Sequence, residues 1–193
     1  VTLTVQAAGT APLSYQWLRG GVDLNGLTTQ NLTLNELTTN EAGVYSVRVS
    51  SPFGTITSNA GTLTVGYAPV LLAQPTDRNA TVGANTTFVV DVNGTAPLSY
   101  QWQKQVANGS YSDIIGATDS NYTITGVQLT DSKAYRLRIS NTFGNITSNG
   151  ATLTVGTTPS IVTHPVSTHV AVGSNVTLTV QAAGTAPLSY QWL

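Results

Sequence analysis

Side chains that carry enzyme chemistry are sparse in this sequence. Cysteine is absent, which excludes thiol catalysis and cysteine-based zinc sites, and the only histidines are His164 and His169. A Ser-His-Asp triad would need one of these two residues. Gln74 and Asn79 stand 90 residues earlier, at the corresponding repeat positions, so neither histidine belongs to a repeated site. We therefore predict no catalytic residue, no cofactor-binding residue and no enzyme activity.

The carboxylates are also scattered rather than clustered. Asp113 and Asp119 flank one expected loop, whereas Glu41 and Asp131 each stand four residues before a tyrosine. Calcium prefers a dense set of oxygen ligands, and no glycine-rich phosphate loop or metal motif is found in the sequence. We predict no metal site, with a weak calcium site at Asp113 and Asp119 as the alternative.

One pattern with chemical meaning is the Asn-x-Ser/Thr triplet, the acceptor for N-linked glycans. It begins at eight of the 14 asparagines: Asn31, Asn79, Asn85, Asn93, Asn108, Asn121, Asn145 and Asn175. Attached glycans would coat the surface and place the protein outside the cell. Alternating strands rich in threonine would generate the same triplets without modification, so both interpretations stay open.

The composition excludes two classes of partner. Charged residues make up only 8% of the chain and the formal net charge is −1, so no basic face for nucleic acid and no polybasic run is present. No apolar stretch approaches the ~20 residues that a membrane-spanning helix requires. We expect neither nucleic-acid binding nor a membrane span in this segment.

The elements that position these residues are set by an internal repeat. The octapeptide Thr-Ala-Pro-Leu-Ser-Tyr-Gln-Trp ends at Trp17, at Trp102 and at Trp192, which are 85 and then 90 residues apart. This spacing is the size of a small domain. Each copy follows an alternating apolar–polar run, such as Val1–Ala8 with Val1, Leu3 and Val5 inward, and then a Gly-Pro turn.

Similar strand patterns continue through both repeats. We expect strands at Leu13–Leu18, Asn31–Leu37, Tyr45–Ser50 and Thr55–Val65 in the first repeat. The second repeat begins with Val70–Ala73 and Ala80–Gly83, interrupted at Pro75, and has five extra residues in a hairpin at Val106–Ser110.

These observations predict an all-β chain of tandem sandwiches. We expect a domain at 1–66 that lacks its first strand, a complete domain at 67–156, and the first part of a third at 157–193. The junctions Gly66–Pro69 and Gly156–Pro159 are very short linkers, so neighbouring domains should touch or nearly touch.

The pattern as a set resembles the immunoglobulin fold. Glu41 through Tyr45 and Asp131 through Tyr135 are similar to that family's tyrosine corner. The family's two cysteines would fall at Val5 and Val47, and at Val90 and Leu137, so this chain resembles the cysteine-free immunoglobulin-like modules found in tandem on large prokaryotic surface proteins. The resemblance implies that the structural core contains Trp17, Trp102, Trp192, Tyr45 and Tyr135.

The two ends of the sequence carry a second repeat. Val1–Leu18 and Val176–Leu193 are identical at all 18 positions, whereas Thr86–Gln103 matches Val1–Leu18 at only 11. We expect a two-domain unit of 175 residues, repeated in tandem, of which this sequence is a window. The alternative is a fragment cut at poor boundaries.

These expectations lead to a structural, non-catalytic protein: an extracellular or cell-surface fibre, stalk or coat that self-associates into an array. The alternative is an adhesin that binds carbohydrate or protein through loops such as Gln105–Asp113, and a third option is a spacer within a longer enzyme. We also expect interdomain contacts at Phe53, Phe143 and Tyr67, unless Phe143 folds back onto its own domain.

Overall fold

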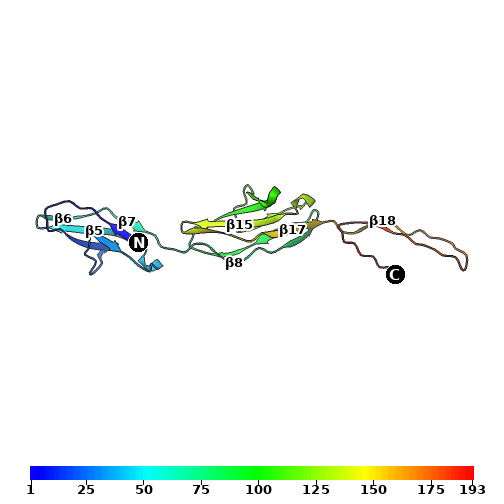
Figure 1. Cartoon of the computed structure of the whole chain (residues 1–193), viewed down its shortest axis with the longest axis horizontal. Coiled ribbons are helices and arrows are strands. Elements are labelled where there is room, and N and C mark those ends of the chain that lie inside the picture. The colour runs from blue at the N-terminus through cyan, green and yellow to red at the C-terminus, as the bar shows by residue number, and fades with distance from the viewer. The chain divides into compact units, whose positions relative to one another are not determined.

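The computed structural model describes residues 1–193 and divides into two compact units, Val1–Tyr67 and Ala68–Leu193 (Figure 1). Both are built from strands. Three-residue 3-10 helices are the only helices, and none is long or apolar enough to cross a membrane. The predicted three-domain partition remains a prediction.

Unit 1 pairs a small sheet with a larger one. Strand β1 pairs with β4, and the five-stranded sheet has the order β3-β2-β5-β6, with β7 also on β5. The elements are β1 (Thr2–Thr4), β2 (Ser14–Arg19), β3 (Val22–Asp23), β4 (Asn31–Thr33), η1 (Thr39–Glu41), β5 (Gly43–Ser51), β6 (Gly54–Thr57) and β7 (Gly61–Leu63).

The core of unit 1 lies between these two sheets. Trp17 in β2 is directly opposite Val47 in β5, and both are buried. Leu32 of the small sheet, Tyr45 and Val49 complete the buried cluster, against which Leu3 and other half-buried residues pack. Val5, one of the two positions expected to join the sheets, is only half-buried.

Unit 2 repeats this plan with additional strands. Its six-stranded sheet has the order β13-β12-β15-β17-β9, with β16 on β15, while β10 pairs with β14, β8 with β11 and β18 with β19. The elements are β8 (Val70–Ala73), β9 (Arg78–Thr81), β10 (Thr86–Val89), β11 (Asp91–Asn93), β12 (Ser99–Gln105), η2 (Ala107–Gly109), β13 (Tyr111–Asp113), β14 (Asn121–Ile124), η3 (Leu129–Asp131), β15 (Ala134–Asn141), β16 (Gly144–Thr147), β17 (Ala151–Gly156), β18 (Ser160–Thr163) and β19 (Gln181–Ala183).

Four aromatic rings form the centre of the unit 2 sandwich. Phe88 in β10 stacks on Tyr135 in β15 at 5.1 Å and lies 6.0 Å from Trp102 in β12. Tyr122 in β14 lies 5.9 Å from Trp102 and from Tyr135. Two rings come from each sheet, so these contacts join the sheets where a disulfide is absent.

The first strand of unit 2 changes sheets at a proline. Strand β8 pairs with β11, and β9, after buried Pro75, pairs in parallel with β17. Proline cannot donate a backbone hydrogen bond, so it suits the point at which one ladder ends and another begins. The predicted interruption at Pro75 is present, although β9 begins at Arg78 rather than Ala80.

Three strand predictions need correction, and the first is Asn31–Leu37, of which β4 covers only Asn31–Thr33. Strand β1 covers only Thr2–Thr4 of the predicted Val1–Ala8, and Val1 is 55% exposed. The predicted strand Thr55–Val65 is split into β6 and β7. The split occurs because the Val47 amide donates a hydrogen bond to the Ser58 hydroxyl. This side-chain bond interrupts the regular backbone pairing with β5 between β6 and β7.

Trp192 was predicted to be a core residue, and the structure places it 51% exposed. Trp102 is covered by residues of the later strand β15, including Tyr135 and Leu137, whereas residues 157–193 contain no strand that covers Trp192. Residues 157–193 contain the β18–β19 pair and no buried residue. The identical octapeptide is therefore buried only where the later strands cover it.

Candidate functional site

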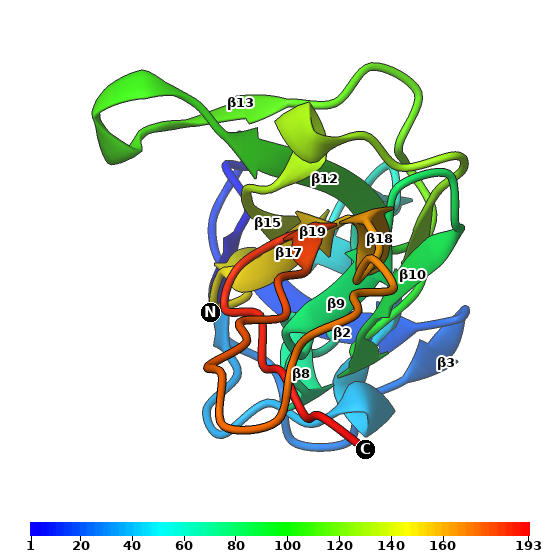
Figure 2. The same cartoon turned by 90° about the vertical axis from the view of Figure 1, so that its right-hand side faces the viewer.

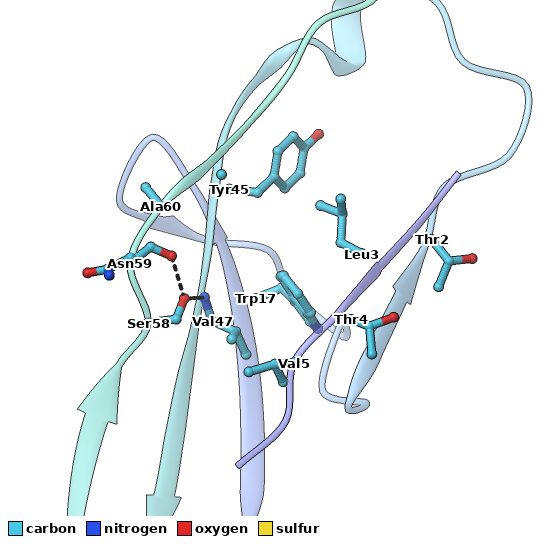
Figure 3. Close-up of a pocket in the computed structure, with 11 residues that line it drawn as sticks. Thr2, Leu3, Thr4, Val5, Trp17, Tyr45, Val47, Ser58, Asn59 and Ala60 are labelled. Atoms are coloured by element: carbon cyan, nitrogen blue, oxygen red, sulfur yellow. Dashed lines mark hydrogen bonds between the residues drawn. The ribbon is translucent and has the colours of Figure 1, made fainter.

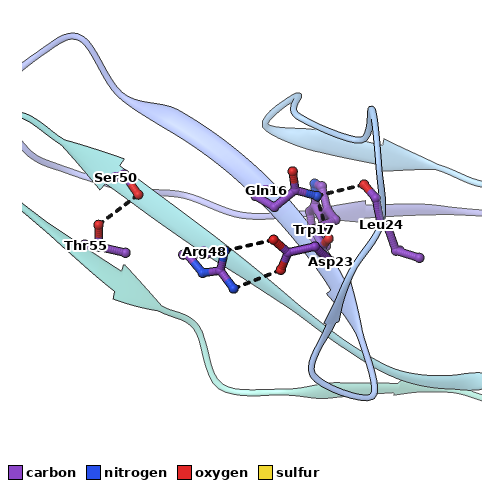
Figure 4. A network of polar contacts seen from close by, with 7 residues as sticks. All are labelled: Gln16, Trp17, Asp23, Leu24, Arg48, Ser50 and Thr55. Atoms are coloured by element: carbon purple, nitrogen blue, oxygen red, sulfur yellow. Dashed lines mark hydrogen bonds and ion pairs between the residues drawn. The ribbon is translucent and has the colours of Figure 1, made fainter.

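The polar side chains of the repeated octapeptide are held by the framework. The Gln16 Nε2 donates to the Trp17 carbonyl at 2.9 Å and to the Leu24 carbonyl at 2.7 Å (Figure 4). Gln101 makes the same two bonds in unit 2, to the carbonyls of Trp102 and Ile114. The repeated glutamine therefore fixes the following loop instead of facing a ligand.

The repeated tryptophan is held in the same way. The Trp17 indole N–H donates to the Thr29 carbonyl at 2.9 Å, and that of Trp102 donates to the Asp119 carbonyl at 3.0 Å. Because both rings are buried and their polar atoms have partners, they are not exposed platforms for stacking a sugar.

Both units also contain the tyrosine corner that the resemblance implies. The Tyr45 hydroxyl donates to the Glu41 carbonyl at 2.7 Å, and the Tyr135 hydroxyl donates to the Asp131 carbonyl at 3.0 Å. The Thr38 backbone N–H and hydroxyl donate to the Glu41 carboxylate, and these bonds lower the pKa of that carboxyl. Burial raises the pKa of Tyr135 to about 12, with a smaller contribution from the Asp131 charge.

A charged pair recurs on the outer face of the larger sheet. In unit 1 the Arg48 guanidinium binds both carboxylate oxygens of Asp23, at 3.0 and 2.9 Å (Figure 4). The equivalent Arg138 and Asp113 in unit 2 are 3.5 Å apart. All four side chains are well exposed, so each pair contributes little to stability but ties the hairpin strand to β5 or β15.

Unit 2 has a larger polar cluster that unit 1 lacks. The Gln103 amide donates to the Asp113 carboxylate at 2.6 Å and accepts from the Arg136 Nε at 2.8 Å. The Arg136 guanidinium lies 4.0 Å from the centre of the Tyr111 ring. Gln103 is buried, and its counterpart in unit 1 is Leu18. We call Gln103, Tyr111, Asp113, Arg136 and Arg138 the polar cluster.

The five-residue insertion carries this cluster. Figure 2 shows the β12–β13 hairpin with its loop extending beyond both strands. Residues Val106–Ser110 are exposed, and η2 lies within them. The loop was predicted as a binding site in the adhesin alternative. The sequence indicated the insertion, but not that Arg136 would stack on Tyr111, because that contact joins two strands that are distant in sequence.

The junction residues pack on the turn of the octapeptide that follows them. A side chain at Gly94 would meet the Pro69 backbone at 3.0 Å, and one at Gly184 would meet Pro159 at the same distance. The Thr157 amide also donates to the Thr185 hydroxyl at 2.7 Å. Each junction is therefore held against the domain that it precedes.

An open groove lies in unit 1 (Figure 3). Its volume is about 460 Å³, and core residues form its floor. Its lining includes Leu3, Val5, Trp17, Tyr45, Val47 and the segment Ser58–Gly61. The equivalent place in unit 2 is covered by β9, which pairs in parallel with β17.

The remaining predicted sites are on the surface. All eight asparagines that begin a triplet are exposed, although the Asn85 side chain accepts from the Gly126 amide. His164 and His169 are exposed, and no group of three or more His, Asp or Glu side chains could hold a metal ion. Phe53 is 82% exposed, Tyr67 is 67% exposed and Phe143 is half-buried. Interdomain contacts at these three residues remain a prediction.

The fold defines the chain as a tandem of immunoglobulin-like β-sandwiches. Solved structures support this class: the chain is similar to the I-band fragment I67–I69 from titin, with a TM-score of 0.67 and 20% identity, covering 93% of this chain and 68% of that one. It is also similar to the four N-terminal immunoglobulin domains of Dscam1, with a TM-score of 0.53, 20% identity, and coverage of 80% and 40%.

Sequence relatives give a mixed set of whole proteins. Endoglucanase C of Cellulomonas fimi is 29% identical over 80% of this chain and 14% of its own length. Contactin-6 of Rattus norvegicus is 27% identical over 92% and 18%, and human leucine-rich repeats and immunoglobulin-like domains protein 1 is 26% identical over 99% and 19%. The chain thus spans less than a fifth of these relatives.

A family described as a domain of unknown function (DUF8696) matches residues 74–157. This range contains residues 74–156 of the second predicted domain, which was expected at 67–156. It covers less than half of the chain.

Proposed function

We propose that this chain is a structural, non-catalytic part of an extracellular or cell-surface protein, in which tandem immunoglobulin-like domains form a fibre, stalk or coat. The observation that carries the proposal is the role of the repeated residues. Gln16 and Gln101, the buried Trp17 and Trp102, and the two tyrosine corners all hold the sandwich together. The residues that are repeated from domain to domain therefore stabilise the fold of each domain.

The contacts at the second junction, Gly156–Pro159, support a restricted rather than a flexible linker there. Gly156, the last residue of β17, lies so close to Thr185 that a side chain at position 156 would meet the Thr185 hydroxyl oxygen at 2.9 Å. Two backbone amides complete the contact: Thr157 donates to the Thr185 hydroxyl, and Thr185 donates to the Thr157 carbonyl. These contacts restrict the backbone of the linker between the two repeats.

The relatives are compatible with a spacer role. Endoglucanase C is named as an enzyme, yet the stretch similar to this chain is only 14% of its length. Contactin-6 and titin, which are also similar to this chain, are not named as enzymes. Because unrelated whole proteins share this fold, the proposal assigns the stretch itself a mechanical task and assigns no activity to it.

Surface glycans fit the same role. The eight triplet asparagines are exposed, and Asn31 and Asn121 occupy equivalent places at the start of β4 and β14. These strands form one edge of the small sheets, and a glycan at such a place would block edge-to-edge pairing. Glycopeptide mass spectrometry of native material should find hexose-containing masses at these two sites. Bare asparagines at all eight would remove this part of the proposal.

The location can be tested on intact cells of the source organism. Antibodies raised against the chain, carrying gold, should label the outer surface of unpermeabilised cells along fibres or a layer. A matched set of permeabilised cells is the control. Labelling that requires permeabilisation would contradict the extracellular role.

The second candidate function is adhesion through unit 2, and the polar cluster is the observation that favours it. Arg138 and Asp113 in this cluster are about half exposed beside the Val106–Ser110 loop. A glycan or protein array probed with the full chain would test it. Binding that Arg138→Ala abolishes and the equivalent Arg48→Ala in unit 1 leaves intact would favour adhesion over the structural role.

A further inference from the structure

The outer face of the larger sheet of unit 2 carries an excess of positive charge. Arg136 and Arg138 stand on either side of buried Leu137 in β15, so both side chains point away from the core to this face. Asp113 is the only carboxylate in the six strands of the sheet. It lies in the same row as Gln103 and Arg136. The face therefore presents two guanidinium groups for one carboxylate.

The equivalent face of unit 1 has its arginine fully paired. The Arg48 guanidinium binds both oxygens of Asp23, at 3.0 and 2.9 Å (Figure 4). Ser46 stands at the position equivalent to Arg136, so unit 1 has no second guanidinium there. The comparison shows that an unpaired arginine is a property of unit 2 and not of the repeated framework.

Gln103 draws the carboxylate of unit 2 away from its arginine. Its amide donates to the Asp113 Oδ1 at 2.6 Å, and the other oxygen, Oδ2, lies 3.5 Å from the Arg138 Nη2, at the limit for a hydrogen bond. The Arg138 side chain is 52% exposed. Arg136 uses its Nε for Gln103 and its planar group for Tyr111, and its terminal nitrogens make no bond within the chain. Both guanidinium groups therefore keep N–H donors that the chain does not use.

The rows of the sheet beside these arginines are polar and uncharged. Thr147 of β16 is directly opposite Arg138 and is exposed. In the next row Ser140 is opposite Ser99 on one side and Asn145 on the other. A flat row of hydroxyl and amide groups can exchange hydrogen bonds with the hydroxyl groups of a sugar chain. It offers no apolar side chain against which a peptide could pack.

We propose that Arg136 and Arg138 form a binding site for the carboxylate groups of an acidic polysaccharide, a chain that contains uronic acids. A guanidinium group matches a carboxylate with two parallel N–H donors. Arg138 binds one carboxylate through the donors that Asp113 leaves free, and the terminal nitrogens of Arg136 add a second positive contact. The inference rests on adhesion, the second candidate function above, and deepens it by naming the class of ligand.

The test is calorimetric titration of the full chain with oligogalacturonate. Binding should weaken as the salt concentration rises, and the neutral methyl ester of the same oligomer should not bind. Arg138→Ala should weaken binding roughly tenfold or more, through loss of hydrogen bonds to a charged group. Arg48→Ala is the matched control and should leave binding unchanged, because Asp23 already occupies that guanidinium. Neither arginine is buried, so both variants fold.

A second variant, Gln103→Leu, tests the arrangement without removing a charge. It gives unit 2 the residue that unit 1 has at the equivalent position, Leu18, where the same pair of strands forms. The change frees the Asp113 carboxylate to bind Arg138 as Asp23 binds Arg48. Binding of oligogalacturonate should therefore weaken, although the net charge of the face is unchanged.

Three outcomes would overturn the inference. The first is equal affinity of the wild type and Arg138→Ala for oligogalacturonate, and the second is equal binding of the acid and its methyl ester. The third is binding of poly-L-glutamate without binding of oligogalacturonate, which would favour an acidic protein as the partner. If a glycan array instead shows Arg138-dependent binding of neutral sugars alone, the inference fails while adhesion stands. Cell-surface labelling is unaffected by any of these results, so the structural role is tested separately.

Discussion

The same tryptophan occurs in three copies of one octapeptide, and its environment decides its contribution to stability. Trp102 is 0% exposed and its indole N–H is hydrogen-bonded, whereas Trp192 is 51% exposed. Replacing Trp102 with Ala removes a large buried ring and leaves a cavity, which should lower the free energy of unfolding of unit 2 by about 3–5 kcal/mol.

Trp192→Ala is the matched control for that prediction. Exposed positions usually change stability by no more than about 0.5 kcal/mol, so this variant should unfold with wild-type stability. Urea denaturation followed by circular dichroism measures both. Equal losses in the two variants would contradict the framework role assigned to Trp102.

Tyr135 makes the stability of unit 2 depend on high pH. Burial raises the pKa of Tyr135 to about 12 in the folded state, above the value of roughly 10 expected in the unfolded chain. Below about pH 10 the phenol is protonated in both states and the stabilisation is complete. Between about pH 10 and 12 the unfolded state loses the proton first, so the free energy of unfolding should fall by about 2 kcal/mol.

The variant Tyr135→Phe separates this effect from general alkaline denaturation. It should be less stable at neutral pH by about 1 kcal/mol, through loss of the hydrogen bond to the Asp131 carbonyl. It should also show a shallower decline above pH 10. A variant with the same alkaline slope as the wild type would show that Tyr135 does not cause the decline.

The β12–β13 hairpin packs against the residue that precedes β17. A side chain at Gly150 would meet the Tyr111 hydroxyl at 2.5 Å, whereas unit 1, which lacks the insertion, has Ala60 at the equivalent position. Gly150→Ala should therefore destabilise unit 2 by about 1 kcal/mol, because the Tyr111 ring must move from its place beside Arg136.

A double-mutant cycle checks this contact. In a Tyr111→Ser background, Gly150→Ala should have almost no effect on the unfolding free energy, since the obstructing ring is gone. Additive effects of the two substitutions would mean that the hairpin and β17 are independent.

Local patterns predicted the elements well and their ends poorly. Three features were predicted correctly because each depends on residues that are near one another in sequence. They are the alternation around Trp102, the interruption at Pro75 and the longer hairpin. The Ser58 step between β6 and β7 was missed, since it depends on a bond to Val47 in another strand. Trp192 was placed in the core because the motif was read without the strands that must cover it.

The candidate sites were less predictable for the same reason. The polar cluster joins Gln103, Tyr111 and Arg136 across three strands. In the sequence, only the five-residue insertion indicated that this part of unit 2 differs from unit 1. The groove in unit 1 was implied by the expected absence of a first strand in residues 1–66, but its floor of Trp17 and Val47 needed the register of β2 against β5.

For the molecule as a whole, the two units should differ in stability. The buried cluster of unit 1 has Trp17 and four other residues, and that of unit 2 has eleven residues including the stacked Phe88 and Tyr135. Less buried apolar area means a smaller free energy of unfolding. We expect two calorimetric transitions, with unit 1 unfolding at the lower temperature.

Two core substitutions assign these transitions. Val47→Ala should lower only the first transition, and the equivalent Leu137→Ala should lower only the second, because each is buried in its own unit. A single cooperative transition that both substitutions shift equally would contradict independent units.

The central claim is that these domains form a structural array whose period is a pair of domains. Electron microscopy of native material tests it most directly. We expect filaments or a layer in which the axial repeat corresponds to the 175 residues separating Val1 from Val176. Discrete particles containing one chain, or a regular repeat of one domain, would contradict it.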